Sequence, residues 1–495
     1  MLGLPLAGAL INRLVFPKKP TRGARVATSF IWAGLLVALT SLTNEVLFPG
    51  QASVPGFQGD VLSWLMATLI LLVSGIVHHF SRRYMAGDRA YHRYFTHLSL
   101  VTASALLMVL ADHLGWLLLG WGVSNLLLVR LIIHKAGWAA AFNSGKLALQ
   151  TFVPGFICLC IAFLILASVG GSIYLHELIK AENTGAYTRP TVAALLLILV
   201  AAMTQSAQIP FHRWLTSSLN SPTPVSALMH AGLVNGGGFL LARFAPLYLH
   251  YPDLLQLLFV LGSVTALVGT GWKLMQSDVK RMLACSTMGQ MGFMIMQCGL
   301  GLFPAAVAHL CWHGLFKAFL FLNSGSAVQE KRPPQPSTDS VLTWLLAGIG
   351  GLAGGYGFAM LSDKSLLAGD TTLLLTGFAW MATTQVAHTV LQGGSFVIRF
   401  IPAMGLALLA GSLYGISVHS IDALMGPLAI WVPQPLTLLH GLVFGLFFLI
   451  WLGLNLKLPL VGLSSRVGRQ LYVSALNSSQ PHHSTTTPTR TSYQY

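Results

Sequence analysis

About fifteen apolar runs, nearly all of them about as long as a helix that crosses a lipid bilayer and the first one short, follow one another along this 495-residue chain. Backbone amides inside a bilayer find no water, so each run must satisfy its own hydrogen bonds as a helix. Only 8% of the residues are charged, against about 25% in a typical soluble domain. The sequence therefore predicts an all-α polytopic membrane protein with about 14–15 transmembrane helices. The runs lie near residues 2–16, 25–43, 60–79, 97–112, 114–134, 148–170, 191–212, 224–248, 255–275, 281–302, 304–325, 341–361, 371–391, 399–416 and 438–456.

The distribution of basic residues predicts an orientation. With the N-terminus in the periplasm, 21 of the 28 Lys and Arg residues fall in cytoplasmic segments and three in periplasmic loops. Cytoplasmic loops of membrane proteins carry such an excess. We therefore expect a periplasmic N-terminus and a cytoplasmic C-terminus. Four basic residues fall within runs, and of these Arg243, near an outer end, is expected to extend its guanidinium towards the interface.

The sequence predicts a single transmembrane domain over residues 1–475, because no linker is long enough to separate soluble domains. The Ser/Thr-rich segment 476–495 is expected to be a disordered cytoplasmic tail. All five cysteines lie in or beside apolar runs and are interpreted as small apolar side chains. We expect no metal, cofactor or nucleophile site in this chain. The net charge of +15 arises from short loops, as membrane topology requires, so it does not indicate nucleic-acid binding.

One apolar run carries three regularly spaced titratable residues, in the sequence "HLCWHGLFKAFLF". His309, His313 and Lys317 recur every four residues and therefore share one helix face. Ionisable groups inside a membrane are costly and usually functional. We interpret the stripe as a proton relay, because histidine titrates near neutrality and a desolvated lysine can release its proton. A structural role in helix packing is the alternative. A zinc site on the two histidines would lack a third ligand and would face a repelling lysine.

A second run is interrupted by polar residues and prolines, in "MTQSAQIPFHRWLTSSLNSPTPVSALMHAG" at 203–232. Pro210 removes a backbone donor and interrupts the helix ladder. Broken spans are tolerated only where the freed backbone groups face protein or a water-filled cavity. Gln205, Gln208 and His212 supply polar groups for such a cavity. The stretch therefore predicts a discontinuous helix that lines a half-channel.

Other polar residues of the apolar regions leave their roles open. His230 precedes three glycines that permit close helix packing, in "HAGLVNGGGF". Asp363 and Lys364, in "LSDKSLLAG", form either the mouth of a channel or a simple loop pair. Asp112 lies in a tight turn between two runs and is expected to be solvated.

The motifs "SAQIPFHRWL…SPTPVSALMHAG", "QSDVKRMLACSTMGQMGFM" and "HLCWHGLFKAFLFLNSGS" resemble the antiporter-like membrane subunits of respiratory complex I and of the Mrp antiporters. The resemblance covers roughly residues 60–400. Within this superfamily, "HAGLVNGGGFLLARFAPL" and "MGFMIMQCGLG" are most similar to the DabB family, the membrane subunits of two-protein inorganic carbon accumulation systems. The resemblance implies two inverted five-helix repeats, roughly within 97–391, each with one broken helix. The first break would be the stretch at 203–232, and the second would lie near 345–370.

The resemblance also implies roles for individual residues. Lys317 matches the central lysine of the family, and His309 and His313 match the histidines that precede it. His230 matches the histidine after the Pro-x-Pro stretch. The "SDK" at 362–364 corresponds to a Ser-Lys-Asp element at the channel exit, with acid and base exchanged.

Two departures from the complex I pattern are informative. Gly122 stands where those subunits carry a glutamate, and Gln205 stands where they carry the lysine that pairs with it. Losing both members is consistent, because losing one alone would leave an uncompensated buried charge. The coupling pair of the first half-channel is therefore neutral in this chain.

The resemblance implies a subunit in a bacterial inner membrane that conducts a cation, either protons or sodium. It would work with a large DabA-like partner that resembles a β-carbonic anhydrase and holds zinc. Catalysis would then reside in the partner, and this chain would not itself be an enzyme. Two alternatives remain: a cation/proton antiporter or complex I type subunit, and a non-conducting membrane scaffold.

Overall fold

The computed structural model describes residues 1–50, 55–182, 189–328, 341–364, 369–392, 396–456 and 466–486. Eleven helices in these ranges are long and apolar enough to span a membrane, with α10 and α11 taken together as one of them. Four more predicted runs correspond to α8, α14, α17 and the short α1, so every predicted run contains a helix. The α-helices are α1 (Gly3–Leu14), α2 (Pro20–Leu47), α3 (Val61–Tyr84), α4 (Tyr91–Leu110), α5 (Leu114–Ile132), α6 (Ala139–Gly170), α7 (Leu175–Glu182), α8 (Arg189–Gln205), α9 (Arg213–Thr216), α10 (Thr223–Ala231), α11 (Gly236–Arg243), α12 (Ala245–Tyr248), α13 (Pro252–Leu274), α14 (Val279–Gly299), α15 (Phe303–Leu322), α16 (Val341–Leu361), α17 (Thr372–Leu391), α18 (Phe396–Met425), α19 (Leu438–Asn455) and α20 (Arg466–Ser478).

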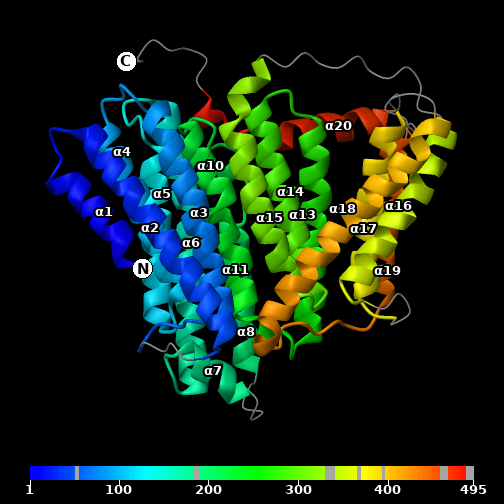
Figure 1. The fold of residues 1–495 in the computed structure, drawn as a ribbon, viewed down its shortest axis with the longest axis horizontal. Helices are drawn as coiled ribbons and strands as arrows, with labels where there is room; N and C mark the ends of the chain where they lie inside the picture. The colour runs from blue at the N-terminus through cyan, green and yellow to red at the C-terminus, as the bar shows by residue number, and fades with distance from the viewer. Residues whose placement is uncertain are drawn as a thin grey trace.

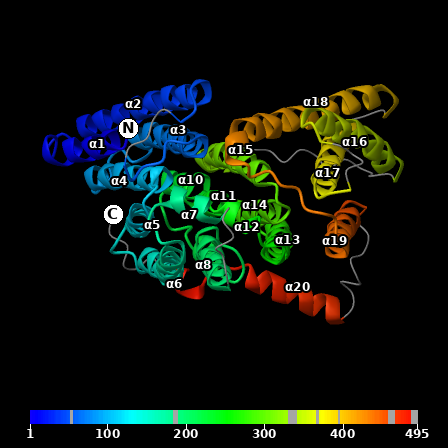
Figure 2. The same ribbon diagram turned by 90° about the horizontal axis from the view of Figure 1, so that it is seen from below.

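The long helices run roughly side by side in two groups (Figure 1). Helices α1–α15 form one continuous bundle with a shared apolar core, and α16–α18 pack on one another as a second group. Short α7 lies at one end of the bundle and α20 lies across the other, so we refer to the α7 face and the α20 face of the protein. Figure 2 shows α20 along the edge of the molecule, between α19 and the side where α6 and α8 lie.

The discontinuous helix predicted at 203–232 is present. Helix α8 ends at Gln205, and the chain then continues through turns and the four-residue α9 before α10 begins at Thr223. A second interruption follows, where the 3-10 turn Leu233–Asn235 separates α10 from α11. The polar and proline residues of this stretch therefore occupy irregular backbone inside the bundle.

The second broken helix, expected near 345–370, is not found within α16. This helix is continuous from Val341 to Leu361, and α17 packs beside it. Residues 365–368 lie outside the described residues. The segment contains no proline to interrupt it. The glycines of α16 instead let a neighbouring helix approach closely. A Cβ added to Gly411 of α18 would lie 1.9 Å from the carbonyl oxygen of Gly354 of α16. The two backbones approach too closely for any side chain at position 411.

The expectation of a disordered tail from residue 476 is wrong for residues 476–486. Helix α20 continues to Ser478, and the following residues dock on the α20 face. The amide of His482 donates to Ser217 Oγ at 2.9 Å, and Asn220 Nδ2 donates to the carbonyl of Thr485 at 2.9 Å. Polar Ser/Thr composition predicts disorder only where no partner surface offers hydrogen bonds, and here such a surface exists. Residues 487–495 lie outside the described residues.

Candidate functional site

The predicted stripe lies on α15 and borders a cavity of about 670 Å³. The rings of His309 and His313 are 6.1 Å apart between centroids, and Lys317 is only 1% exposed. The opposite wall comes from the second helix group and α19. The structure thus brings all three stripe residues to one cavity. Its other polar lining residues are Thr270, Lys273, Ser286, Gln290, Trp312, Thr383 and Tyr414.

The surroundings of Lys317 contain no opposite charge. Its Nζ donates to the carbonyl of Leu283, at 3.4 Å, and within the described residues it forms no ion pair. Lys273 of α13 lines the same cavity and adds a second positive charge nearby. A buried ammonium without a carboxylate is unfavourable. The geometry therefore suits a lysine that changes protonation better than a fixed structural cation.

His230 connects α10 to the stripe. Its Nδ1 lies 3.0 Å from Thr287 Oγ1, and its ring stacks on Phe321 with centroids 4.2 Å apart. The structure therefore places His230 next to α15, and its part in an ion path stays a prediction.

The two stripe histidines carry unpaired nitrogens. Nε2 of His309 and Nε2 of His313 are buried, and neither has a hydrogen-bond partner among the described residues. Buried polar atoms of this kind are usually satisfied by ordered water. The cavity beside them has ample room for several water molecules. The arrangement leaves room for water beside both rings, and a proton relay along α15 stays a prediction.

The residues of the interrupted helix lie apart from this cavity. Gln205 Nε2 donates to the carbonyl of Leu233 at 3.0 Å, which ties α8 to the second interruption. The Oε1 atoms of Gln205 and Gln208 and both ring nitrogens of His212 are buried, with no partner among the described residues. Pro210 is in the turn between them. None of the four lines the cavity of Lys317, so the half-channel role predicted for them stays a prediction.

Asp363 and Lys364 also lie away from the relay, next to the end of α16. Lys364 Nζ is 2.9 Å from Asp422 Oδ2 of α18, and it sits 3.7 Å from the centroid of the Trp431 ring. Asp363 has a left-handed backbone conformation, with φ of 56°. The lysine is thus held by an ion pair to α18 and a cation–π contact, and the part of Asp363 and Lys364 in an ion path stays a prediction.

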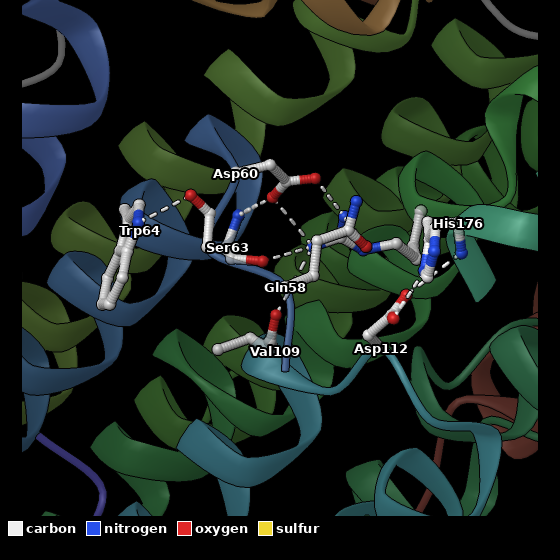
Figure 3. Close-up of polar contacts among 9 residues, drawn as sticks. Gln58, Asp60, Ser63, Trp64, Val109, Asp112 and His176 are labelled. Atoms are coloured by element: carbon white, nitrogen blue, oxygen red, sulfur yellow. Dashed lines mark hydrogen bonds and ion pairs between the residues drawn. The ribbon is translucent and has the colours of Figure 1, made fainter. Parts of the chain in front are cut away.

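Arg243 does not extend towards an interface as expected. It is 4% exposed and forms a bidentate ion pair with Asp60, which caps α3. It also donates to Ser63 Oγ at 2.6 Å and to Gln58 Oε1 at 3.2 Å. Figure 3 shows Asp60, Gln58 and Ser63 converging at this point. The sequence signal that was missed is the aspartate directly before an apolar run, an N-cap position that also offers a carboxylate.

Asp112 is likewise buried rather than solvated. Its Oδ2 lies 2.6 Å from Nδ1 of His176, and its Oδ1 accepts the amide of the same residue (Figure 3). This contact fastens α7 to the turn between α4 and α5. Among the described residues, no group of three or more His, Cys, Asp or Glu side chains is arranged to hold a metal ion.

Comparisons with known proteins define the class. The family described as "NADH:quinone oxidoreductase/Mrp antiporter, TM" matches residues 111–344, and the N-terminal family of complex I chain 5 matches residues 52–95. The fold is similar to a chain of the Mrp complex from Dietzia sp. DQ12-45-1b, with a TM-score of 0.58 at 21% identity. That likeness covers 97% of this chain and 52% of the Mrp chain. The family matches and the fold are thus those of an antiporter-like membrane subunit.

Two curated relatives identify the family within this class. The chain is 38% identical over 350 residues to the probable inorganic carbon transporter subunit DabB of Bacillus anthracis, covering 70% of this chain and 68% of the relative. It is 37% identical over 420 residues to the probable subunit DabB1 of Halothiobacillus neapolitanus, covering 77% and 74%. The chain belongs to the family of DabB inorganic carbon transporter subunits.

Proposed function

We propose that this chain is the proton-conducting membrane subunit of an energy-coupled complex that accumulates inorganic carbon. Its partner would be a DabA-like protein that resembles a β-carbonic anhydrase, holds zinc and hydrates CO2. Movement of protons or sodium through the membrane subunit would drive the trapping of bicarbonate. The names of the curated relatives support the carbon substrate.

The observation that carries the proposal is the stripe of His309, His313 and Lys317 on the wall of a cavity of about 670 Å³ between α15 and the second helix group. Water in the cavity would pass a proton to a histidine, and the neutral form of Lys317 would accept it. His230 of α10 lies next to α15, with its ring stacked on Phe321. Release would require the lysine to lose its proton again, which an amine without a carboxylate partner does readily.

Two other functions remain candidates. A cation/proton antiporter or complex I type subunit is favoured by the class, but the neutral Gly122 and Gln205 do not reproduce its coupling pair. Gly122 faces the Phe156 ring of α6, where an added Cβ would lie 3.1 Å from the nearest ring carbon. A non-conducting scaffold would explain that loss, but it offers no reason for an unpaired lysine at position 317.

Co-expression tests the proposed function. In bacteria that lack carbonic anhydrase and therefore need elevated CO2, this chain alone should not restore growth in air. Co-expression with its large zinc-holding partner should restore it, because the described residues of this chain include no metal cluster for hydration chemistry. Growth restored by this chain alone would contradict the division of labour, and failure of the pair would contradict the carbon substrate.

The orientation is tested by cysteine labelling in intact cells. We propose that the α7 face is periplasmic and the α20 face cytoplasmic, in the inner membrane, from the 21 basic residues against three. A cysteine at Gly50 should react with a membrane-impermeant maleimide added outside, whereas one at Pro488 should react only after permeabilisation. The reverse pattern would show that the topology is inverted.

A further inference from the structure

A second buried titratable group lies between α3 and α4, outside the cavity of Lys317. His78 of α3 is completely buried. Its Nδ1 lies 2.8 Å from the carbonyl oxygen of Ser74 and 3.1 Å from Ser74 Oγ, and its Nε2 lies 3.2 Å from Ser99 Oγ. Ser74 Oγ is in turn 2.6 Å from Thr102 Oγ1. Four side chains from two helices thus form one continuous hydrogen-bonded chain.

The positions of the hydrogens in this hydrogen-bonded chain follow from its acceptors. A carbonyl oxygen only accepts, so His78 Nδ1 carries a hydrogen and donates it to Ser74. In the neutral ring, Nε2 therefore accepts from the hydroxyl of Ser99. If Nε2 takes up a proton, that hydroxyl only has to rotate to become the acceptor. His78 is therefore able to gain a proton without leaving any ring nitrogen unpaired.

The hydrogen-bonded chain ends at a small cavity of about 30 Å³, which is lined by Thr102 of α4 and by Asn235 of the 3-10 turn between α10 and α11. A single water molecule needs about 10–15 Å³ of such space. Asn235 is 1% exposed, and its Oδ1 has no hydrogen-bond partner among the described residues. Its Nδ2 donates to the carbonyls of Ala231 and Leu310, at 2.9 and 3.4 Å. One water there would satisfy Oδ1 and contact the Thr102 hydroxyl.

We propose that a water bound between Thr102 and Asn235 joins His78 to the interruption between α10 and α11, so that His78 is a further protonatable residue of the conduction path. The ring would take up a proton at Nε2 and release the one at Nδ1 to Ser74 Oγ. The Ser74 hydrogen would pass to Thr102 Oγ1. The Thr102 hydroxyl, which in the structure donates to the carbonyl of Leu98 at 3.0 Å, would turn and pass its hydrogen to the water. One proton enters and one leaves, and His78 ends as the other neutral tautomer.

This inference rests on the proposed function and explains how a neutral first half can still move protons. Gly122 and Gln205 leave no titratable group at the usual coupling positions. His78 supplies one within the same bundle. A further pair of polar side chains lies between α3 and α4 towards the α20 face, where Ser81 Oγ and Tyr94 Oη are 3.0 Å apart.

The test compares two substitutions of Thr102 in the co-expressed complex. Thr102→Val keeps the shape but removes the hydroxyl, and should lower carbon uptake roughly tenfold, because one positioned hydrogen bond of the chain is lost. Thr102→Ser keeps the hydroxyl and should stay near the wild type. Ser104→Ala is the control on the same helix, since that hydroxyl bonds only to the carbonyl of Val101. His78→Phe should also lose uptake while the partner still co-purifies.

A high-resolution cryo-EM map of the wild-type complex supplies a readout that does not depend on activity. It should show density for one water between Thr102 Oγ1 and Asn235 Oδ1. An empty position, or wild-type uptake by both Thr102→Val and His78→Phe while Lys317→Ala is inactive, would overturn this inference and leave the proposed function intact. If Lys317→Ala is also fully active, the proposed function itself fails.

Discussion

Replacing Lys317 by alanine should abolish growth in air that depends on the complex, while the partner protein still co-purifies. Positioned proton-transfer groups accelerate the steps in which they act by about 10²–10⁴-fold. The rate of carbon uptake should therefore fall at least a hundredfold. Lys317 is 1% exposed, borders the large cavity and has no carboxylate partner among the described residues. Its removal deletes the amine without leaving a counter-charge stranded, so assembly should persist.

Three further substitutions define what the lysine does. Lys317→Arg should fail as well, because a guanidinium keeps its proton at physiological pH. His313→Ala should impair uptake strongly, since its ring lies between His309 and the lysine along the stripe. Gln205→Ala should have a milder effect, because that position carries no titratable group. Normal growth with both Lys317→Ala and Lys317→Arg would rule out the relay and favour the scaffold.

The elements that the sequence predicted are those set by local composition. An apolar run of about 20 residues has no alternative to a helix in a bilayer, so each of the fifteen runs contains one. The interruption after Gln205 could be predicted in the same way, because Pro210 removes a backbone hydrogen-bond donor from its own turn. The stripe on α15 followed from helical periodicity alone. These features need no knowledge of which helices are neighbours.

Contacts between distant segments could not be predicted in the same way. Arg243 and Asp60 are 183 residues apart, and nothing local marks them as partners. The same holds for Asn220 and Thr485, which bring an apparently disordered tail onto the bundle. The second break was expected by analogy, yet α16 carries glycines that pack against α18 and no proline. In each case the tertiary neighbour decides the structure, not the residue's own propensity.

The ion pair of Asp60 and Arg243 should be the largest single electrostatic contribution to stability on the α7 face. Asp60→Asn would leave the guanidinium, 4% exposed, without its counter-charge. Removing one partner of a buried pair costs about 3–5 kcal/mol. The free energy of unfolding, measured by titrating detergent-solubilised chain with SDS, should fall by that amount. Glu177→Gln, an exposed acid on α7, is the matched control and should change it by less than about 0.5 kcal/mol.

The double variant Asp60→Asn/Arg243→Gln distinguishes the loss of the ion pair itself from the cost of leaving a buried guanidinium without a counter-charge. Because it removes both charges, it should recover most of the stability that Asp60→Asn loses. A double variant no more stable than the single one would show that the two residues do not act as a pair, and that the cost lies in the cap of α3.

Stability should also depend on pH through this pair. Burial raises the pKa of the Asp60 carboxyl, but the charge and hydrogen bonds of Arg243 outweigh it, so the pKa lies below its ordinary value of 3.8. A carboxyl with a lowered folded-state pKa stabilises the fold fully above its unfolded pKa, and this contribution is lost as the pH falls through the folded value. Between pH 7 and 5 the difference between wild type and Asp60→Asn should therefore stay constant. Below about pH 3.8 it should shrink, because protonation then removes from the wild type the same charge that the substitution removes.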